Sequence, residues 1–178
     1  RSTPNMLNPN PTTVALTTVQ VIEAWGGEWS YNTNNLDATP NWTTTGGDGW
    51  LTGTALFGTE PSGILFPTPI VTVIPPPIAG NPPTYLTTYF RKSITLPPLA
   101  AGTSYALNHI TDDGAVFYLD GAVIGLFNMP NGPVSYTNLA TGIVTGGDEG
   151  VLLNLPFTAV AGPHTLAVEV HQFTVGTS

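Results

Sequence analysis

Hydrophobic and polar residues alternate along two stretches of the chain. In TYFRKSITL (residues 88–96), apolar side chains that include Phe90 and Leu96 share one parity, while polar side chains fill most of the other. In HTLAVEVHQF (residues 164–173), apolar residues around Val168 again recur at every second position. A period of two is typical of a strand with one face in a hydrophobic core. Both stretches are therefore predicted to form β-strands.

Three short apolar runs lie between these stretches. They are SYALNHI, AVFYL and AVIGLF, and they are separated by TDDG and DG. Asp-Gly between apolar runs favours a type I′ hairpin turn, because both central residues of that turn need a positive φ. Tight turns are accordingly predicted at Asp113-Gly114 and Asp120-Gly121. Short strands at this spacing predict an all-β fold, an antiparallel β-sandwich with jelly-roll topology.

The other segments show turn and loop chemistry. Residues 1–18 open with a Pro-rich run and are predicted to form an extended arm before a single sandwich domain of residues 19–178, although TVALTTVQVI at the junction has strand chemistry. Residues 26–50 are expected to form ordered loops pinned by buried indoles. Residues 61–83 carry eight Pro and are predicted to be loop with at most an edge strand at 70–74.

Composition excludes several classes of function. Three basic against eleven acidic residues give a net charge of -8, which argues against a phosphate-binding surface, so nucleic acid is not an expected partner. With no Cys, the chain has no disulfide framework and no thiolate metal site. No apolar run approaches the roughly 20 residues of a membrane span.

Four acids in two Gly-containing segments could supply oxygen ligands to calcium. They are Asp112, Asp113, Asp148 and Glu149. The spaced acids of an EF-hand are missing from both segments, so turn chemistry is the competing interpretation and no cofactor is required. A glycosidase would need two acids held across a cleft, and neither a GxSxG nor an HExxH motif occurs. We therefore predict that the chain is not an enzyme.

Arg91, Glu169 and His171 fall on the non-core parity of their strands. An unpaired arginine would be costly to bury there. We therefore expect Arg91 to contact Glu169 on one sheet face, with His171 alongside. The role of this contact is structural, or the three residues form the floor of a ligand groove.

Aromatic rings are the natural platforms for the apolar faces of sugars. The candidates for stacking are Trp25, Trp29, Trp42 and Trp50 with Tyr31, and of these we single out Trp25, Trp42 and Trp50 as ligand-binding residues. Tryptophan is also a normal core residue of a sandwich, and two of the four are expected in the core.

Five segments of the chain resemble, in sequence and order, a jelly-roll module found in large secreted bacterial proteins. They are EWSYNTNNLDATPNW with GDGWLTGTALFG, then TTYFRKSITL, DDGAVFYLDGAVIGLFNMPNGPVSY, GDEG and HTLAVEVHQ. More distantly, YFRKSITL, DGAVFYLDGAVIG and GPHTLAVEV are similar to the galactose-binding-like domains of bacterial β-galactosidases. The resemblance implies a jelly roll without a catalytic centre, often appended to larger proteins and often credited with carbohydrate contact.

The expected function is thus a non-catalytic extracellular or cell-surface module for attachment, with glycan as partner. The alternative is a structural subunit of an extracellular filament or virion surface, whose partners are other copies of itself. Modules of this kind continue beyond the EVHQ strand into a final strand, so an open sheet edge is expected here, and the N-terminal arm could supply a strand to it.

Overall fold

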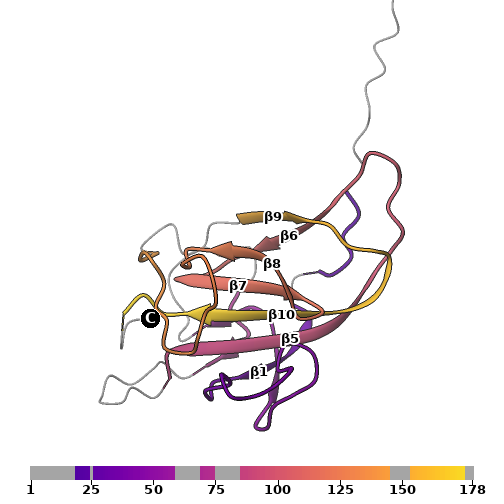
Figure 1. Ribbon diagram of the computed structural model, residues 1–178. Coiled ribbons are helices and arrows are strands. Elements are labelled where there is room, and N and C mark those ends of the chain that lie inside the picture. The colour runs from indigo at the N-terminus through magenta and orange to yellow at the C-terminus, as the bar shows by residue number, and fades with distance from the viewer. Residues whose placement is uncertain (1–18, 25, 59–68, 75–84, 145–152, 175–178) are drawn as a thin grey trace, which may run out of the picture.

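The computed structural model describes residues 19–24, 26–58, 69–74, 85–144 and 153–174, and within them the chain forms ten β-strands and no helix (Figure 1). No helix in these ranges could therefore cross a membrane. The largest element is a six-stranded sheet. Its strands, in spatial order, are β2 (Leu51–Thr54), β1 (Glu28–Asn32), β5 (Thr87–Leu96), β10 (Gly162–His171), β7 (Gly114–Leu119) and β8 (Ala122–Phe127).

All neighbours in this sheet are antiparallel. The two alternating stretches of the sequence are its central strands, β5 and β10, which pair over their full length. Two small sheets complete the described structure. β6 (Tyr105–His109) pairs antiparallel with β9 (Leu153–Phe157), and β3 (Phe57–Gly58) pairs parallel with β4 (Thr72–Val73). β4 is the edge strand that the Pro-rich segment was predicted to contain.

The hydrophobic core lies between the six-stranded sheet and the β6–β9 pair. Ile94 and Leu96 from β5 and Leu166 from β10 pack against Tyr105 of β6, whose ring stacks on Phe157 of β9 with centroids 5.5 Å apart. Two antiparallel layers around one core confirm the predicted all-β sandwich. Jelly-roll connectivity and the division at residue 19 remain predictions, because the arm lies outside the described residues.

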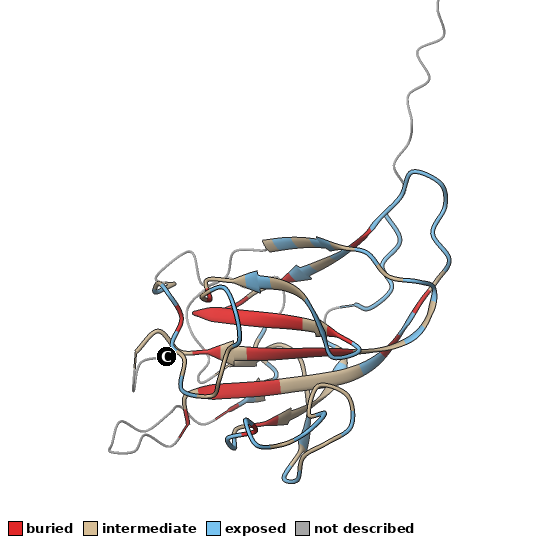
Figure 2. Ribbon diagram, in the orientation of Figure 1, coloured by how far each residue is buried: buried red, intermediate tan, exposed pale blue. Residues whose placement is uncertain are grey.

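The second face of the six-stranded sheet is also covered. Tyr89, Glu169 and His171 are buried on this face although they lie on the non-core parity of their strands, and buried residues run along the central strands (Figure 2). Two segments cover it: residues 33–50, called the covering loop below, and residues 128–144. The central strands are therefore buried on both faces, whereas the alternation of the sequence predicts only one.

The two Asp-Gly pairs have different structures. Asp120 and Gly121 join β7 to β8 with φ values of 51° and 85°, which confirms the predicted type I′ hairpin turn. The prediction at Asp113-Gly114 is wrong, because Gly114 is the first residue of β7 and the preceding strand, β6, pairs with β9 instead. A Cβ on Gly114 would lie 2.7 Å from the Met129 sulfur, so this glycine is needed for close packing.

The described end of the predicted strand TVALTTVQVI also differs from expectation. Residues 19–22 form no strand, and Val19 and Val21 are exposed. Whether the arm adds a strand to its own or another subunit stays a prediction.

Candidate functional site

The candidate site is built on β5 and the covering loop. Arg91, in the middle of β5, donates from Nη1 to the carbonyl oxygens of Trp42 at 2.7 Å and Gly46 at 3.1 Å. Its guanidinium carbon lies 4.2 Å from the centroid of the Trp50 ring. Burial lowers the pKa of Arg91, but a guanidinium titrates so far above neutrality that it remains charged. One cation therefore holds three points of the covering loop.

The predicted contact between Arg91 and Glu169 is wrong. Among the described residues no ion pair joins them, because the cross-strand neighbour of Arg91 on β10 is Ala167, and Glu169 lies beside Tyr89 instead. Loop carbonyls and an indole face satisfy the guanidinium in place of a carboxylate. Alternation placed both side chains on the correct face, but it carries no information about the loop that covers that face.

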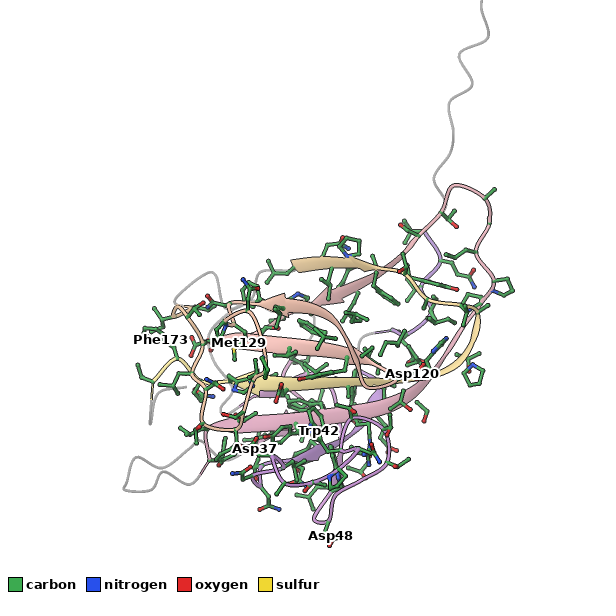
Figure 3. All side chains as sticks on the ribbon, viewed as in Figure 1. Asp37, Trp42, Asp48, Asp120, Met129 and Phe173 are labelled. Carbon is green, nitrogen blue, oxygen red and sulfur yellow. The ribbon has the colours of Figure 1, made fainter. Side chains whose placement is uncertain are left out.

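Trp42 and Trp50 both lie in the covering loop and are partly exposed. The Trp42 ring contacts Tyr89 and Tyr118 edge-on, with centroids 4.7 and 5.5 Å away, so it sits over the central strands (Figure 3). The indole nitrogen of Trp50 donates to the carbonyl of Gly46 at 3.2 Å. The expectation of ordered loops pinned by buried indoles is met only in part: the two indoles are partly exposed, and residues 28–32 of that stretch form β1. Trp25 lies outside the described residues.

The covering loop is closed by its own hydrogen bonds. The carbonyl of Asn41, a residue at φ 59°, accepts from the amides of Thr44, Thr45 and Gly46. The side-chain amide of Asn32 donates to the carbonyl of Asp48 at 2.7 Å, which ties the returning end of the loop to β1. Asp48 itself is exposed, at the tip of the loop in Figure 3. The backbone is thus fixed while several polar side chains remain in solvent.

Glu169 and His171 form a second, fully buried part of the same sheet face. Their closest atoms, Glu169 Oε2 and His171 Nε2, are 3.5 Å apart, and the Tyr118 hydroxyl donates to Glu169 Oε1 at 2.5 Å. Burial, and next the charge of Glu169, raise the pKa values of Tyr89 and Tyr118, so both phenols are neutral. The prediction that His171 lies alongside Glu169 is confirmed.

His171 attaches residues 128–144 to the sheet. Its Nδ1 lies 2.8 Å from the carbonyl oxygen of Asn138, which can only accept, so Nδ1 carries a proton. Thr87, its cross-strand neighbour, lies 3.0 Å from the same nitrogen and donates its hydroxyl to the carbonyl of Tyr136 at 2.8 Å. These contacts are internal, so Glu169 and His171 do not line an open groove in the described structure.

The acids that were candidates for calcium have separate environments. Asp113 is buried, and its two carboxylate oxygens accept from the amides of Val144 at 2.8 Å and Phe173 at 2.7 Å. Asp112 is partly buried, while Asp148 and Glu149 lie outside the described residues. No group of three or more potential metal-ligating side chains occurs in the described ranges. Asp113 thus ties two distant segments of the chain together and does not form the predicted turn, and calcium stays an untested prediction.

The remaining histidines are held by hydrogen bonds. His109 is buried, its Nδ1 lies 2.8 Å from the Thr111 hydroxyl, and burial lowers its pKa to about 4. His164 Nδ1 lies 2.6 Å from Asp120 Oδ2, and this bond raises the pKa of His164. Asp120 Oδ1 also accepts from the Thr165 amide, and this bond and then His164 lower the pKa of Asp120.

Three residues that organise this face were not singled out from the sequence. Tyr89 and Tyr118 carry the packing of Trp42, and Asn128 at φ 54° donates to the carbonyls of Asp113 and Gly142. The sequence does carry a signal for the two tyrosines, because they occupy the positions of their strands that face away from the core, on the same sheet face as Arg91 and Glu169. Asn128 directly follows β8 and adopts a left-handed conformation, which asparagine tolerates. The groups that it binds are distant in the sequence, so no short sequence pattern predicts its role.

Comparison with known proteins shows little kinship. No family model and no curated protein matches the sequence. Among solved structures, a β-glucuronidase from Faecalibacterium prausnitzii matches with a TM-score of 0.41 and 15% identity over 88% of this chain and 22% of that enzyme. The chain thus spans about a fifth of the length of that protein, and a match at this TM-score carries no argument about function.

Proposed function

We propose that this chain is a non-catalytic extracellular module that attaches to surfaces by contacting carbohydrate through the covering loop. The observation that carries the proposal is the pair of partly exposed indoles, Trp42 and Trp50, held by Arg91 and by the ring of Tyr118. Binding sites for small polar ligands combine aromatic surface with a few placed polar groups. Rings that are already fixed lose little conformational freedom on binding.

Polar side chains surround these rings. Asn34, Asn35, Asn41 and Asp48 are exposed on the covering loop and provide amide and carboxylate groups for sugar hydroxyls.

The environment of the acids supports the non-catalytic part of the proposal. A glycosidase needs two carboxyl groups about 5–10 Å apart that both face the substrate. Asp113 binds two backbone amides, Asp120 binds a backbone amide and His164, and Glu169 is buried under Tyr118. Each of these three carboxylates has a structural partner at a different place in the sheet.

The experiment is a broad glycan array followed by calorimetry on each hit. Trp42→Phe and Trp50→Phe should each weaken binding by about tenfold, which corresponds to about 1.4 kcal/mol. Trp29→Phe is the matched control, because Trp29 packs against the core on the other face of the sheet. An array and calorimetry without any binding, or an equal loss in the Trp29 variant, would overturn the proposal.

A second candidate function, self-assembly into a filament or virion surface, is favoured by β8. Among the described strands β8 pairs with β7 alone, it contains no charged residue, and its Val123 and Leu126 are 56% and 36% exposed. Uncharged edges with exposed apolar side chains tend to pair with another chain. Sedimentation velocity of the wild type and Val123→Lys tests it. Assembly that the substitution abolishes supports this function, and a monomer at high concentration contradicts it.

A further inference from the structure

We propose that the glycan bound by the covering loop is uncharged, because the described surface offers no free cation to an anionic polymer. This inference rests on the proposed function and specifies its ligand class. The chain has three Lys and Arg residues, and Arg1 lies outside the described residues. Any positive charge that the described surface could offer to a ligand must therefore come from Arg91, Lys92 or the histidines.

Arg91 lies beneath the covering loop and donates hydrogen bonds to the loop backbone. Its Nη1 donates to the carbonyls of Trp42 and Gly46, and the guanidinium carbon lies 4.2 Å from the centroid of the Trp50 ring. Bidentate recognition of a carboxylate or sulfate needs two parallel N–H groups of this fork. An anionic sugar that used Nη1 for such a pair would have to displace the contacts that hold the loop in place.

Lys92 is also occupied. Its Nζ lies 2.7 Å from Glu23 Oε2 and 5.4 Å from the centroid of the Trp29 ring, and its side chain is only 12% exposed. Its charge is thus compensated by Glu23. Lys92 also lies on the core parity of β5, opposite Leu166, whereas Arg91 and the covering loop lie on the other face.

The three histidines add no accessible positive charge. His109 and His171 are buried, and the lowered pKa of His109 keeps it neutral at pH 7. His164 is bound to Asp120, which compensates any charge it carries.

Negative charge, by contrast, is exposed around the loop. Asp37 and Asp48 belong to the covering loop, and Glu28 begins the adjacent β1. A carboxylate or sulfate on a sugar at the loop would meet these charges within about a Debye length, which is about 10 Å at 0.1 M salt. Neutral sugar hydroxyls would instead donate hydrogen bonds to the same carboxylates and to the side-chain amides. The charge pattern thus rejects anionic glycans and accepts neutral ones.

The experiment compares polysaccharides that differ only in charge. Two pairs are suitable: a neutral galactan with its sulfated derivative, and methyl-esterified with de-esterified polygalacturonan. Calorimetry at pH 8, at low salt and at about 0.15 M salt, should show at least tenfold tighter binding of the neutral member and little dependence on salt. Equal or tighter binding of the charged member, weakening as salt rises, would overturn this inference and leave the proposed function standing. No binding to any polysaccharide would overturn both.

A charge variant tests the local origin of the preference. Asp48→Lys places a cation at the exposed tip of the loop and should reduce the preference for the neutral polymer at least threefold at low salt. Ala101→Lys adds a cation in the exposed connection between β5 and β6 and serves as the control for total charge. Equal effects of the two variants, or no effect of Asp48→Lys with an unchanged melting temperature, would contradict the proposal.

Discussion

The guanidinium of Arg91 lies over the ring of Trp50, 4.2 Å from its centroid, and also donates to the backbone of the covering loop. This arrangement links β5 to three points in the second half of a loop that has no regular secondary structure over most of its length. Arg91 adds these contacts to the hydrogen bonds within the loop, and substitution of Arg91 measures their contribution.

Arg91→Lys should lower the free energy of unfolding by about 1–3 kcal/mol, because an ammonium lacks the planar face and the fork that make these contacts. Urea denaturation provides the measurement. Lys92→Met is the control at the next position, and it should cost less than about 1 kcal/mol because its partner Glu23 is 44% exposed. Similar losses in the two variants would contradict the role assigned to Arg91.

Gly114→Ala should destabilise the protein by about 1–3 kcal/mol through overpacking. The new Cβ would lie 2.7 Å from the Met129 sulfur, 2.9 Å from the Ala140 Cβ and 3.0 Å from the Asn128 carbonyl oxygen. Adding Ala140→Gly should recover part of the loss in thermal melts. Gly102→Ala is the control, since nothing lies within 4 Å there and only its φ of +78° opposes a side chain. An equal loss at Gly102 would mean that packing is not the reason for Gly114.

Patterns within a short stretch of sequence predict those parts of the fold that depend only on residues close together in the chain. The alternation in β5 and β10 identifies both central strands and the face of each residue. Asp120-Gly121 identifies a hairpin because the two strands that pair are adjacent in the chain. The same dipeptide fails at Asp113-Gly114 because β6 pairs with β9, which is distant in sequence.

The candidate site was less predictable for the same reason. Arg91 is satisfied by carbonyls from residues 42 and 46, and any residue type presents a carbonyl, so no sequence pattern marks the partner. His171 likewise binds the carbonyl of Asn138. Sequence reasoning placed Arg91, Glu169 and His171 on one face, but the loops that cover this face decide which of them meet.

Acid should destabilise the protein through His109. Its pKa is lowered to about 4 in the folded chain and is about 6.5 when unfolded, so the unfolded state binds more protons between these values. Stability should be unaffected by this group above about pH 6.5 and should fall by up to about 3 kcal/mol as pH drops to 4. Urea titrations should show a flatter profile over this window for His109→Phe. An unchanged profile would contradict the assignment.

The contact between Asp120 and His164 should stabilise the folded chain in the pH range in which protonation of His109 destabilises it. Because the pKa of His164 is raised in the folded chain, protonated His164 stabilises the fold below its unfolded pKa, and this stabilisation is lost as pH rises through its folded pKa. Because the pKa of Asp120 is lowered in the folded chain, ionised Asp120 stabilises the fold above its unfolded pKa, and this stabilisation is lost as pH falls through its folded pKa. Their contact is therefore strongest between about pH 4 and 6.5. In Asp120→Asn the pKa of His164, followed by NMR, should fall towards its normal range, and an unaltered titration would contradict the contact.

Asp113→Asn should destabilise the protein by about 1–3 kcal/mol whether or not calcium is present. The amides of Val144 and Phe173 each donate to one oxygen of Asp113, and asparagine would turn an N–H group towards one of these donors. We expect Asp113 to serve these two amides only, so any calcium-dependent rise in the melting temperature of the wild type should persist in Asp113→Asn. A bound ion would add about 2.7 kcal/mol at a hundredfold excess over Kd. A calcium-dependent rise that Asp113→Asn abolishes would assign the carboxylate to a metal instead of to these two amides.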